Sequence, residues 1–316
     1  MRTVCVIIIT YNRKDLLRNL LEHLKQQSYP ISCILLVDNN SLDGTSNMLS
    51  ELGYIKECIP GEIVCNTIAN WKFMYLKNKE NTGGSGGFAK AFDLAKNLPY
   101  DVIWAMDDDV APASDCLETL MKYLTDEAQM VIPCRGDDNF KDYAIQHYNL
   151  SNPFYFKVNQ RKRDKILFSE IKEPYVVVED MAFEGPLMTR KLIQKIGIPD
   201  KNYFILFDDT DYAHRASEVT QIRYVRKALL KKMIIPNSSI RWSWKSYYNF
   251  RNSVFFEKRY GKNWMVRNIS PLLRLLDLLT RALLKCNFYR IKWLIKGYSD
   301  GVHSRMGKTY APSEIE

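Results

Sequence analysis

Histidine is scarce in this sequence, and neither the histidines nor the cysteines are spaced for metal binding. The 316 residues include seven cysteines and four histidines. No C-x-x-C pair occurs, and no histidines stand at the spacing that zinc sites use. An odd number of cysteines also argues against a disulfide framework. We therefore expect reduced, mostly buried thiols.

Long hydrophobic runs are also missing. No stretch reaches the roughly 18 uncharged apolar residues that span a membrane. The opening MRTVCVIIIT contains an apolar run of only about six residues, which is typical of a buried strand and not of a signal-peptide core. We expect a globular protein that is made and kept in the cytosol.

Acidic residues are scarce in the last quarter of the chain. Residues 241–316 contain 15 Lys and Arg against 5 Asp and Glu, a balance of +10. The whole chain has a formal net charge of +9, so residues 1–240 carry 30 against 31, or −1. This asymmetry indicates a near-neutral catalytic or binding body followed by a basic region that contacts something anionic.

The first 135 residues alternate short apolar runs with helical patterns. This alternation predicts an α/β fold, with a parallel sheet flanked by helices. The expected strands are residues 3–10, 33–40, 72–78, 101–107 and 129–134, and the expected helices are residues 16–24, 87–98 and 116–124.

Polar loops follow four of these strands: TYNRK, DNNSLDGT, NKENTGGSGG and DDDVAP. In an open parallel sheet the ligand crevice lies outside the carboxyl ends of the strands, so the four loops are expected to converge. The last begins with Asp107, Asp108 and Asp109. Adjacent carboxylates repel one another and need a cation, hydrogen-bond donors or open solvent. The alternative is an acidic turn before a helix that starts near Ser114.

Two other loops carry binding features of their own. Asp38 ends a strand where a carboxylate can accept from a base or a ribose hydroxyl, or can close an Asx turn. The run NTGGSGGF has a backbone that can approach a ligand closely and open a helix towards phosphate. Gly84, Gly86 and Ala89 also satisfy the dinucleotide fingerprint G-x-G-x-x-G/A. We reject that reading because KNKENT separates the glycines from the strand, and because three acids follow instead of one.

A second acidic cluster follows the apolar run YFILF. Here Asp208, Asp209 and Asp211 precede a helical pattern, and a carboxylate in this position can act as a general base. The alternative is a helix N-cap at Asp209 or Thr210. A cation site, a base and a nucleotide-shaped crevice together indicate group transfer from a nucleoside diphosphate derivative.

Taken in order, TYNR, VDNNSLDGT, NTGGSGGF, MDDD and FDDTDYAHRA resemble the motifs of family 2 glycosyltransferases with the GT-A fold. Within that family the chain is similar to the galactofuranosyltransferase and rhamnosyltransferase branch, which builds bacterial surface polysaccharides. The resemblance covers about residues 3–255 and, more loosely, GYSDGVHSRMGK near the end.

The resemblance implies an inverting transfer to a hydroxyl of a glycan or lipid-linked glycan, at the inner face of the cell membrane. The donor implied is UDP-galactofuranose, with dTDP-rhamnose as the alternative. A non-catalytic nucleotide- or glycan-binding protein is the alternative from another class. Asp209 is then the catalytic base, and Asp107 and Asp109 hold Mn²⁺ or Mg²⁺. The implied donor-binding residues are Thr10, Asn12, Arg13, Asp38, Asn81, Gly83, Gly84, Gly86, Gly87, Asp107 and Asp108. The implied acceptor-binding residues are Glu184, Gly185, Asp208, Asp211, Arg241 and Trp242.

One departure from the family pattern concerns the metal. Many relatives carry a histidine just before the YYNFRN segment, whereas this chain has no histidine between His214 and His303. Either the metal is held by carboxylates, diphosphate and water alone, or Arg241 supplies positive charge in its place.

We expect a catalytic GT-A domain over residues 1–245, with a nucleotide-binding half of about 1–135 and an acceptor half of about 136–245. Residues 246–316 form a basic helical region. From Ser270 onward, Arg274, Asp277, Arg281, Lys285, Lys292 and Lys296 fall on one helical stripe among apolar residues. Such a helix docks on the catalytic domain, forms a homodimer or lies on an anionic membrane surface. Interleaved aliphatic residues argue against nucleic acid.

Overall fold

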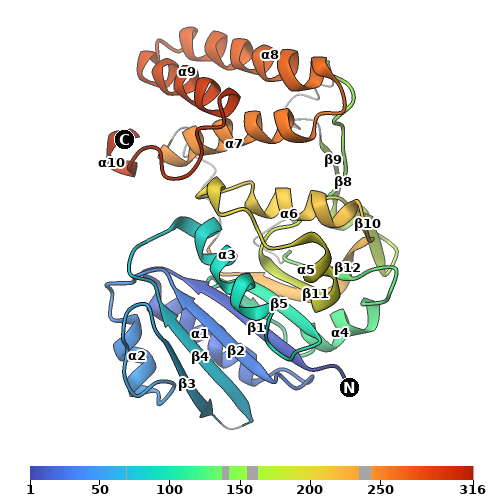
Figure 1. Cartoon of the computed structure of the whole chain (residues 1–316). Coiled ribbons are helices and arrows are strands. Elements are labelled where there is room, and N and C mark those ends of the chain that lie inside the picture. The colour runs from blue at the N-terminus through green and yellow to red at the C-terminus, as the bar shows by residue number, and fades with distance from the viewer. Residues whose placement is uncertain (69, 137–141, 155–162, 235–242, 316) are drawn as a thin grey trace.

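A computed structural model describes the chain except for residues 69, 137–141, 155–162, 235–242 and 316 (Figure 1). Its described residues form a ten-stranded sheet in the order β10-β12-β7-β11-β5-β1-β2-β4-β3, with β6 paired to β12. The neighbours β5, β1, β2 and β4 are parallel, as are β7 and β12, and the other pairs are antiparallel. This confirms the predicted α/β class.

The strands of this sheet are β1 (Val4–Thr10), β2 (Cys33–Asp38), β3 (Ile63–Ile68), β4 (Trp71–Lys77), β5 (Val102–Asp107), β6 (Val110–Pro112), β7 (Met130–Cys134), β10 (Tyr175–Val178), β11 (Glu184–Thr189) and β12 (Ile222–Lys232). A separate hairpin joins β8 (Tyr143–Tyr148) to β9 (Arg163–Leu167). The helices are α1 (Lys14–Lys25), α2 (Thr45–Glu51), α3 (Gly83–Ala95), α4 (Cys116–Tyr123), α5 (Arg190–Ile196), α6 (Asp208–Ser217), α7 (Trp244–Tyr260), α8 (Trp264–Leu283), α9 (Phe288–Val302) and α10 (Pro312–Ile315), with 3-10 turns η1 (Phe168–Glu170) and η2 (Lys201–Tyr203).

The central strands are buried on both faces, which explains their nearly continuous apolar sequence. Val6 and Ile8 of β1 pack with Leu20 of α1 in one core cluster. Ile7, the intervening residue, packs in a second cluster with Phe92 of α3. The sheet therefore holds α1 against one face and α3 against the other, and it fixes the loops at its carboxyl edge.

The C-terminal helices α7, α8 and α9 lie together beyond α6, at the top of Figure 1. The expected single helical stripe from Ser270 is wrong, because α8 ends at Leu283 and α9 begins at Phe288 after a turn. Arg274 is moreover turned inward and pairs with Glu257. No helix in the described residues is long and apolar enough to cross a bilayer.

Candidate active site

Asp107, Asp108 and Asp109 lie where β5 ends and the chain turns into β6. The buried Asp108 carboxylate accepts hydrogen bonds from the Thr10 hydroxyl at 2.7 Å and from the Arg13 guanidinium at 3.0 Å. Arg13 also donates to Asp109 Oδ2 at 3.1 Å. The triplet does not cap the next helix, because β6 separates it from α4. The first and fourth polar loops of the sheet edge therefore meet through charged hydrogen bonds.

Negative charge accumulates at this edge. Burial raises the pKa of Asp107 well above its ordinary value, and Asp109 and Asp108 raise it further. Burial also raises the pKa of Asp108 to about 6, although Arg13 and Thr10 lower it. Asp109 Oδ1 is buried without a hydrogen-bond partner. A divalent cation here would offset this repulsion and give Oδ1 a partner, so the charge of the triplet fits a metal.

The protein supplies few ligands for such a cation. Among the described residues, no group of three or more His, Cys, Asp or Glu side chains is arranged to hold a metal. Asp107 and Asp109 offer carboxylate oxygens, and the remaining ligands of an oxygen-seeking ion would come from phosphate and water. Mg²⁺ in particular usually keeps several waters and takes one or two carboxylates together with substrate phosphates.

Asp38 and Asn12 organise the two loops beside the triplet. Asp38 is fully buried, and its carboxylate accepts from the Ser41 backbone N–H at 2.7 Å and from the Tyr75 hydroxyl at 2.8 Å. Asn12 adopts a positive φ of 52°, and its side chain accepts from the Leu42 N–H at 2.7 Å. Asp38 therefore holds the shape of its loop, and direct contact between Asp38 and a nucleotide stays a prediction.

The glycine run opens α3, but its members have different surroundings. Gly83 has a φ of +74°, and a Cβ there would lie 2.1 Å from the Phe204 carbonyl oxygen. At Gly87 a Cβ would meet Ile9 of β1 at 2.7 Å, and at Gly86 it would meet Thr82 at 2.5 Å. Gly84 alone of the four faces open space. The run thus serves close packing as well as access to a ligand.

Asn39 ties the glycine run to the sheet, a role that we did not predict. Its side chain donates to Asn81 Oδ1 at 3.1 Å and to the Gly83 carbonyl at 2.8 Å, and it accepts from the Thr82 N–H at 3.1 Å. Asn39 follows Asp38 directly in the DNN sequence. Its position just after a strand could have identified Asn39 as a residue of the site.

The second acidic cluster forms the first turn of α6. Phe204, Leu206 and Phe207 all have positive φ, between 65° and 73°, just before the cluster. Left-handed backbone at three apolar residues is costly and concentrates at functional sites. The N-cap of α6 is Phe207, so the alternative of a cap at Asp209 or Thr210 is wrong.

The three carboxylates of this cluster have different environments. Burial raises the pKa of Asp208 to about 6. Burial, Asp208 and Asp180 raise the pKa of Asp209 well above its ordinary value, while the Thr210 N–H and Arg163 lower it. Asp211 is fully buried and accepts from the hydroxyls of Tyr203 and Tyr260 and from Arg215. Asp211 therefore joins α6 to its neighbours, and its predicted acceptor contact stays a prediction.

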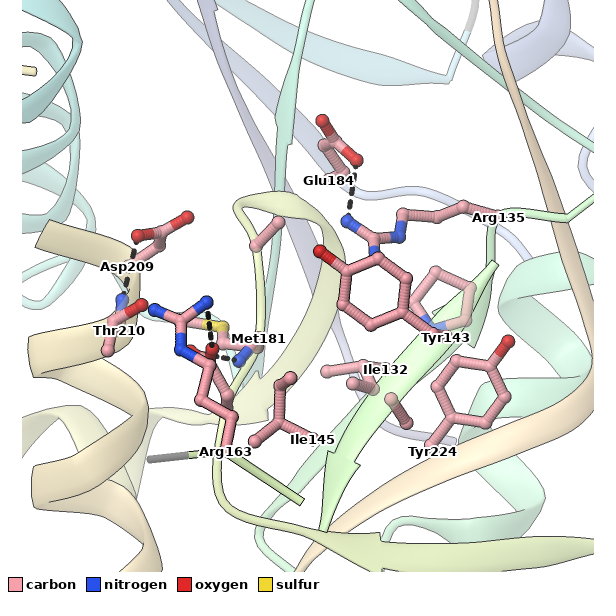
Figure 2. A pocket seen from close by; sticks show the side chains of 14 residues that line it. Ile132, Arg135, Tyr143, Ile145, Arg163, Met181, Glu184, Asp209, Thr210 and Tyr224 are labelled. Atoms are coloured by element: carbon pink, nitrogen blue, oxygen red, sulfur yellow. Dashed lines mark hydrogen bonds and ion pairs between the residues drawn. The ribbon is translucent and has the colours of Figure 1, made fainter. Parts of the chain in front are cut away.

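Asp209 lines a polar pocket together with Arg135, Arg163, Asp180 and Glu184 (Figure 2). In Figure 2, Asp209 and Arg163 lie on one side of this pocket, and Arg135 and Glu184 lie on the other. Such a set of charged groups suits a ligand with several hydroxyls.

Glu184 connects this pocket to the acidic triplet. It accepts from Arg135 at 2.9 Å and from Lys232, the last residue of β12. Its charge also raises the pKa of Asp107 and Asp109, so the three carboxylates interact electrostatically. Gly185, with φ +91°, is confined by Leu230 and Pro133 and cannot carry a side chain there without displacing them.

Several residues of this pocket escaped our sequence predictions. Arg135 follows β7 directly. The expectation that polar residues just after a strand lie at the ligand crevice could therefore have predicted it. Arg163 comes from the hairpin strand β9 and Asp180 from the loop before β11. The sequence in these segments has no periodicity that predicts a helix or a strand. Arg241 and Trp242, predicted to bind the acceptor, lie outside the described residues.

Solved structures with similar folds are glycosyltransferases. The mannosyltransferase PcManGT from Pyrobaculum calidifontis, in complex with GDP-Man and Mn²⁺, aligns with a TM-score of 0.58 and 15% identity over 95% of this chain and 87% of that one. TarS residues 1–349 from S. aureus aligns with a TM-score of 0.53 and 12% identity over 96% and 82%. At these identities the likeness shows the fold alone, and it confirms the GT-A prediction.

Curated relatives are glycosyltransferases as well. Galactofuranosyltransferase GlfT1 of Mycolicibacterium smegmatis is 25% identical over 222 residues, which is 67% of this chain and 64% of that protein. Abequosyltransferase RfbV of Salmonella typhimurium is 30% identical over 127 residues, 40% of this chain and 33% of that protein. The match therefore spans less than two thirds of the length of each relative. The family model described as glycosyl transferase family 2 matches residues 5–173. The chain belongs to glycosyl transferase family 2.

Proposed function

We propose that the protein is an inverting glycosyltransferase that moves a sugar from a nucleoside diphosphate donor to a hydroxyl of a glycan. The observation that supports this most is the placement of Asp209. Its carboxylate lines a polar pocket that Glu184 links to the acidic triplet at the edge of the sheet. A base for the acceptor and a charged site for the donor are therefore neighbours.

In the proposed reaction the anomeric carbon exchanges one oxygen for another. The acceptor oxygen attacks that carbon as the bond to the diphosphate oxygen breaks, and Asp209 takes the acceptor proton. Attack opposite the leaving group inverts the anomeric centre. Arg13 and Lys232 lie beside the triplet and can compensate charge on the departing nucleoside diphosphate.

Asp107 and Asp109 would hold Mn²⁺ or Mg²⁺ in this proposal. When bound, the ion supplies positive charge to the departing diphosphate. Mn²⁺ accompanies the donor sugar nucleotide in PcManGT. In this chain the argument for it is the buried, unpartnered Asp109 Oδ1.

UDP-galactofuranose is our first choice of donor, because GlfT1 is a galactofuranosyltransferase and its match covers 67% of this chain. dTDP-rhamnose is the alternative. The proposed acceptor is a glycan or lipid-linked glycan of a bacterial surface polysaccharide, at the inner face of the cell membrane. The division into a catalytic domain, residues 1–245, and a helical region, residues 246–316, is part of the same proposal.

The test is transfer by Asp209→Asn with UDP-galactofuranose or dTDP-rhamnose. We expect the turnover number to fall by about a factor of 10³, because removal of a general base typically costs 10²–10⁴. The dissociation constant for UDP, measured by calorimetry, should stay within about twofold because Asp209 lies outside the donor site. The matched control is Asp126→Asn, which removes an exposed carboxylate that does not line the pocket.

Two results contradict the assignment. An Asp209→Asn variant with normal turnover would show that another group takes the proton, and one that fails to bind UDP would place Asp209 in the donor site. A wild-type protein that binds UDP but neither transfers nor hydrolyses any donor would be the non-catalytic binding protein.

A further inference from the structure

The segment that includes the end of α8, the turn and the first half of α9 has basic residues and no acidic ones. Residues 281–296 contain five Lys and Arg and no Asp or Glu. Their basic members are Arg281, Lys285, Arg290, Lys292 and Lys296. Lys285 and Lys292 are exposed. We call residues 281–296 the α8–α9 tip.

The same tip exposes large apolar side chains. Leu284 is 81% exposed and Phe288 is 70% exposed, with Leu283 at 54% and Ile295 at 51%. Burying a side chain of this size is worth about 1.5–3 kcal/mol, so leaving several in water at one place needs an explanation. Leu284 and Phe288 are separated only by the short turn, so they project from the same end of the helix pair.

Packing within the chain does not account for these residues. The inner sides of α8 and α9 already bury Leu275, Ala282 and Leu294 against Phe250 and Val254 of α7. That cluster packs α8 and α9 on α7, and docking of these helices on the catalytic domain stays a prediction. The exposed members of the tip point elsewhere and remain to be covered.

A second copy of the chain is a poor partner for the tip. A two-fold symmetric dimer places the same patch against itself, so Lys285, Lys292 and Lys296 would face like charges. Arg281 instead pairs with Asp277 of its own chain at 2.9 Å. Anionic lipid headgroups instead neutralise Lys and Arg, and each such residue near a negative membrane surface contributes about 1 kcal/mol. Apolar side chains flanked by cations are the composition of segments that lie in the interface of a bilayer.

We propose that the α8–α9 tip docks on the surface of an anionic lipid bilayer. Leu284 and Phe288 enter the boundary between headgroups and acyl chains, and Lys285 and Lys292 contact lipid phosphates. The inference deepens the proposed function, since a lipid-linked acceptor lies at a membrane. It rests on the tip alone, however, and its test uses neither donor nor acceptor.

The experiment is cosedimentation of the full chain with vesicles of phosphatidylcholine alone or with phosphatidylglycerol added. We expect binding only to the anionic vesicles, weakened by salt. Lys285→Gln/Lys292→Gln should weaken binding about 25-fold, because each cation is worth about fivefold. Leu284→Ser/Phe288→Ser should weaken it at least tenfold. The matched controls are Lys191→Gln/Lys195→Gln, which removes two exposed cations of α5, and Ile59→Ser/Ile63→Ser, which removes two partly exposed apolar residues near β3.

The exposed thiols give an independent readout of position. Cys286 lies in the tip and Cys65 lies on β3, and both are exposed. An environment-sensitive fluorophore on Cys286 in a Cys65→Ser background should shift to the blue with anionic vesicles. The same label on Cys65 in a Cys286→Ser background should not shift.

Three results overturn the proposal. They are no binding to anionic vesicles, equal losses in the tip and control variants, and a blue shift at Cys65 without one at Cys286. A concentration-dependent dimer in light scattering that Leu284→Ser/Phe288→Ser dissociates, without vesicle binding, would assign the tip to self-association. Transferase activity can persist or fail in any of these cases, so the two proposals are tested separately.

Discussion

At the scale of single residues, the site depends on carboxylates that the protein does not fully neutralise. Asp209 is held among Asp208, Asp180 and Arg163, and the balance of these charges sets its proton affinity. A general base must be ionised to take a proton. Its raised pKa therefore places the rise of activity at a higher pH than an exposed aspartate would give.

This balance predicts opposite shifts in the pH profile of the turnover number. Arg163→Gln removes a cation that lowers the pKa of Asp209, so the rising limb should move to higher pH. Asp208→Asn removes a carboxylate that raises this pKa, so the limb should move to lower pH. Lys165→Gln, on the same strand as Arg163, should leave the limb in place. Shifts of one sign in both pocket variants would show that another group controls the profile.

The sequence could predict which acids gather at the sheet edge, but not how each one is oriented. Thr10, Arg13 and Asp108 meet as expected, because topology alone brings the carboxyl ends of parallel strands together. Asp38 and Asp211 are different, since their oxygens accept hydrogen bonds from tyrosine hydroxyls supplied by distant parts of the chain. Nothing in the local sequence distinguishes a carboxylate that faces a ligand from one that faces the core.

At the scale of elements, all five strands predicted in the first 135 residues are present, although α2, β3 and β6 were not predicted, and prediction weakened afterwards. The parallel strands there are buried on both faces, so they appear as continuous apolar runs. β12 has instead five basic residues among eleven, and β9 reads RDKIL. These strands exist because β7, β10 and β8 pair with them, and such pairing is not encoded in local composition.

Asp211 is the residue on which the junction between α6 and α7 depends. Asp211→Ala would leave Arg215 and the hydroxyls of Tyr203 and Tyr260 without this acceptor, so we expect a loss of about 3 kcal/mol in the free energy of unfolding. Urea titration followed by circular dichroism measures it. Asp200→Ala removes a more exposed partner of Arg259 and should cost less than about 1 kcal/mol. Equal midpoints for the two variants would contradict a structural role for Asp211.

At the scale of the whole molecule, metal and nucleotide binding should stabilise the folded chain together. A ligand at 100 times its dissociation constant adds about 2.7 kcal/mol, which corresponds to a rise of roughly 5 °C or more in Tm. We expect UDP with Mn²⁺ to give this rise, and UDP alone to give a smaller one, since Asp107 and Asp109 repel the diphosphate until a cation intervenes. Asp109→Asn should abolish the increment due to Mn²⁺, whereas the exposed Asp126→Asn should retain it. If UDP raises Tm equally with and without Mn²⁺, and Asp109→Asn changes neither value, then Arg13 and Lys232 suffice for the diphosphate and the proposed metal role is wrong.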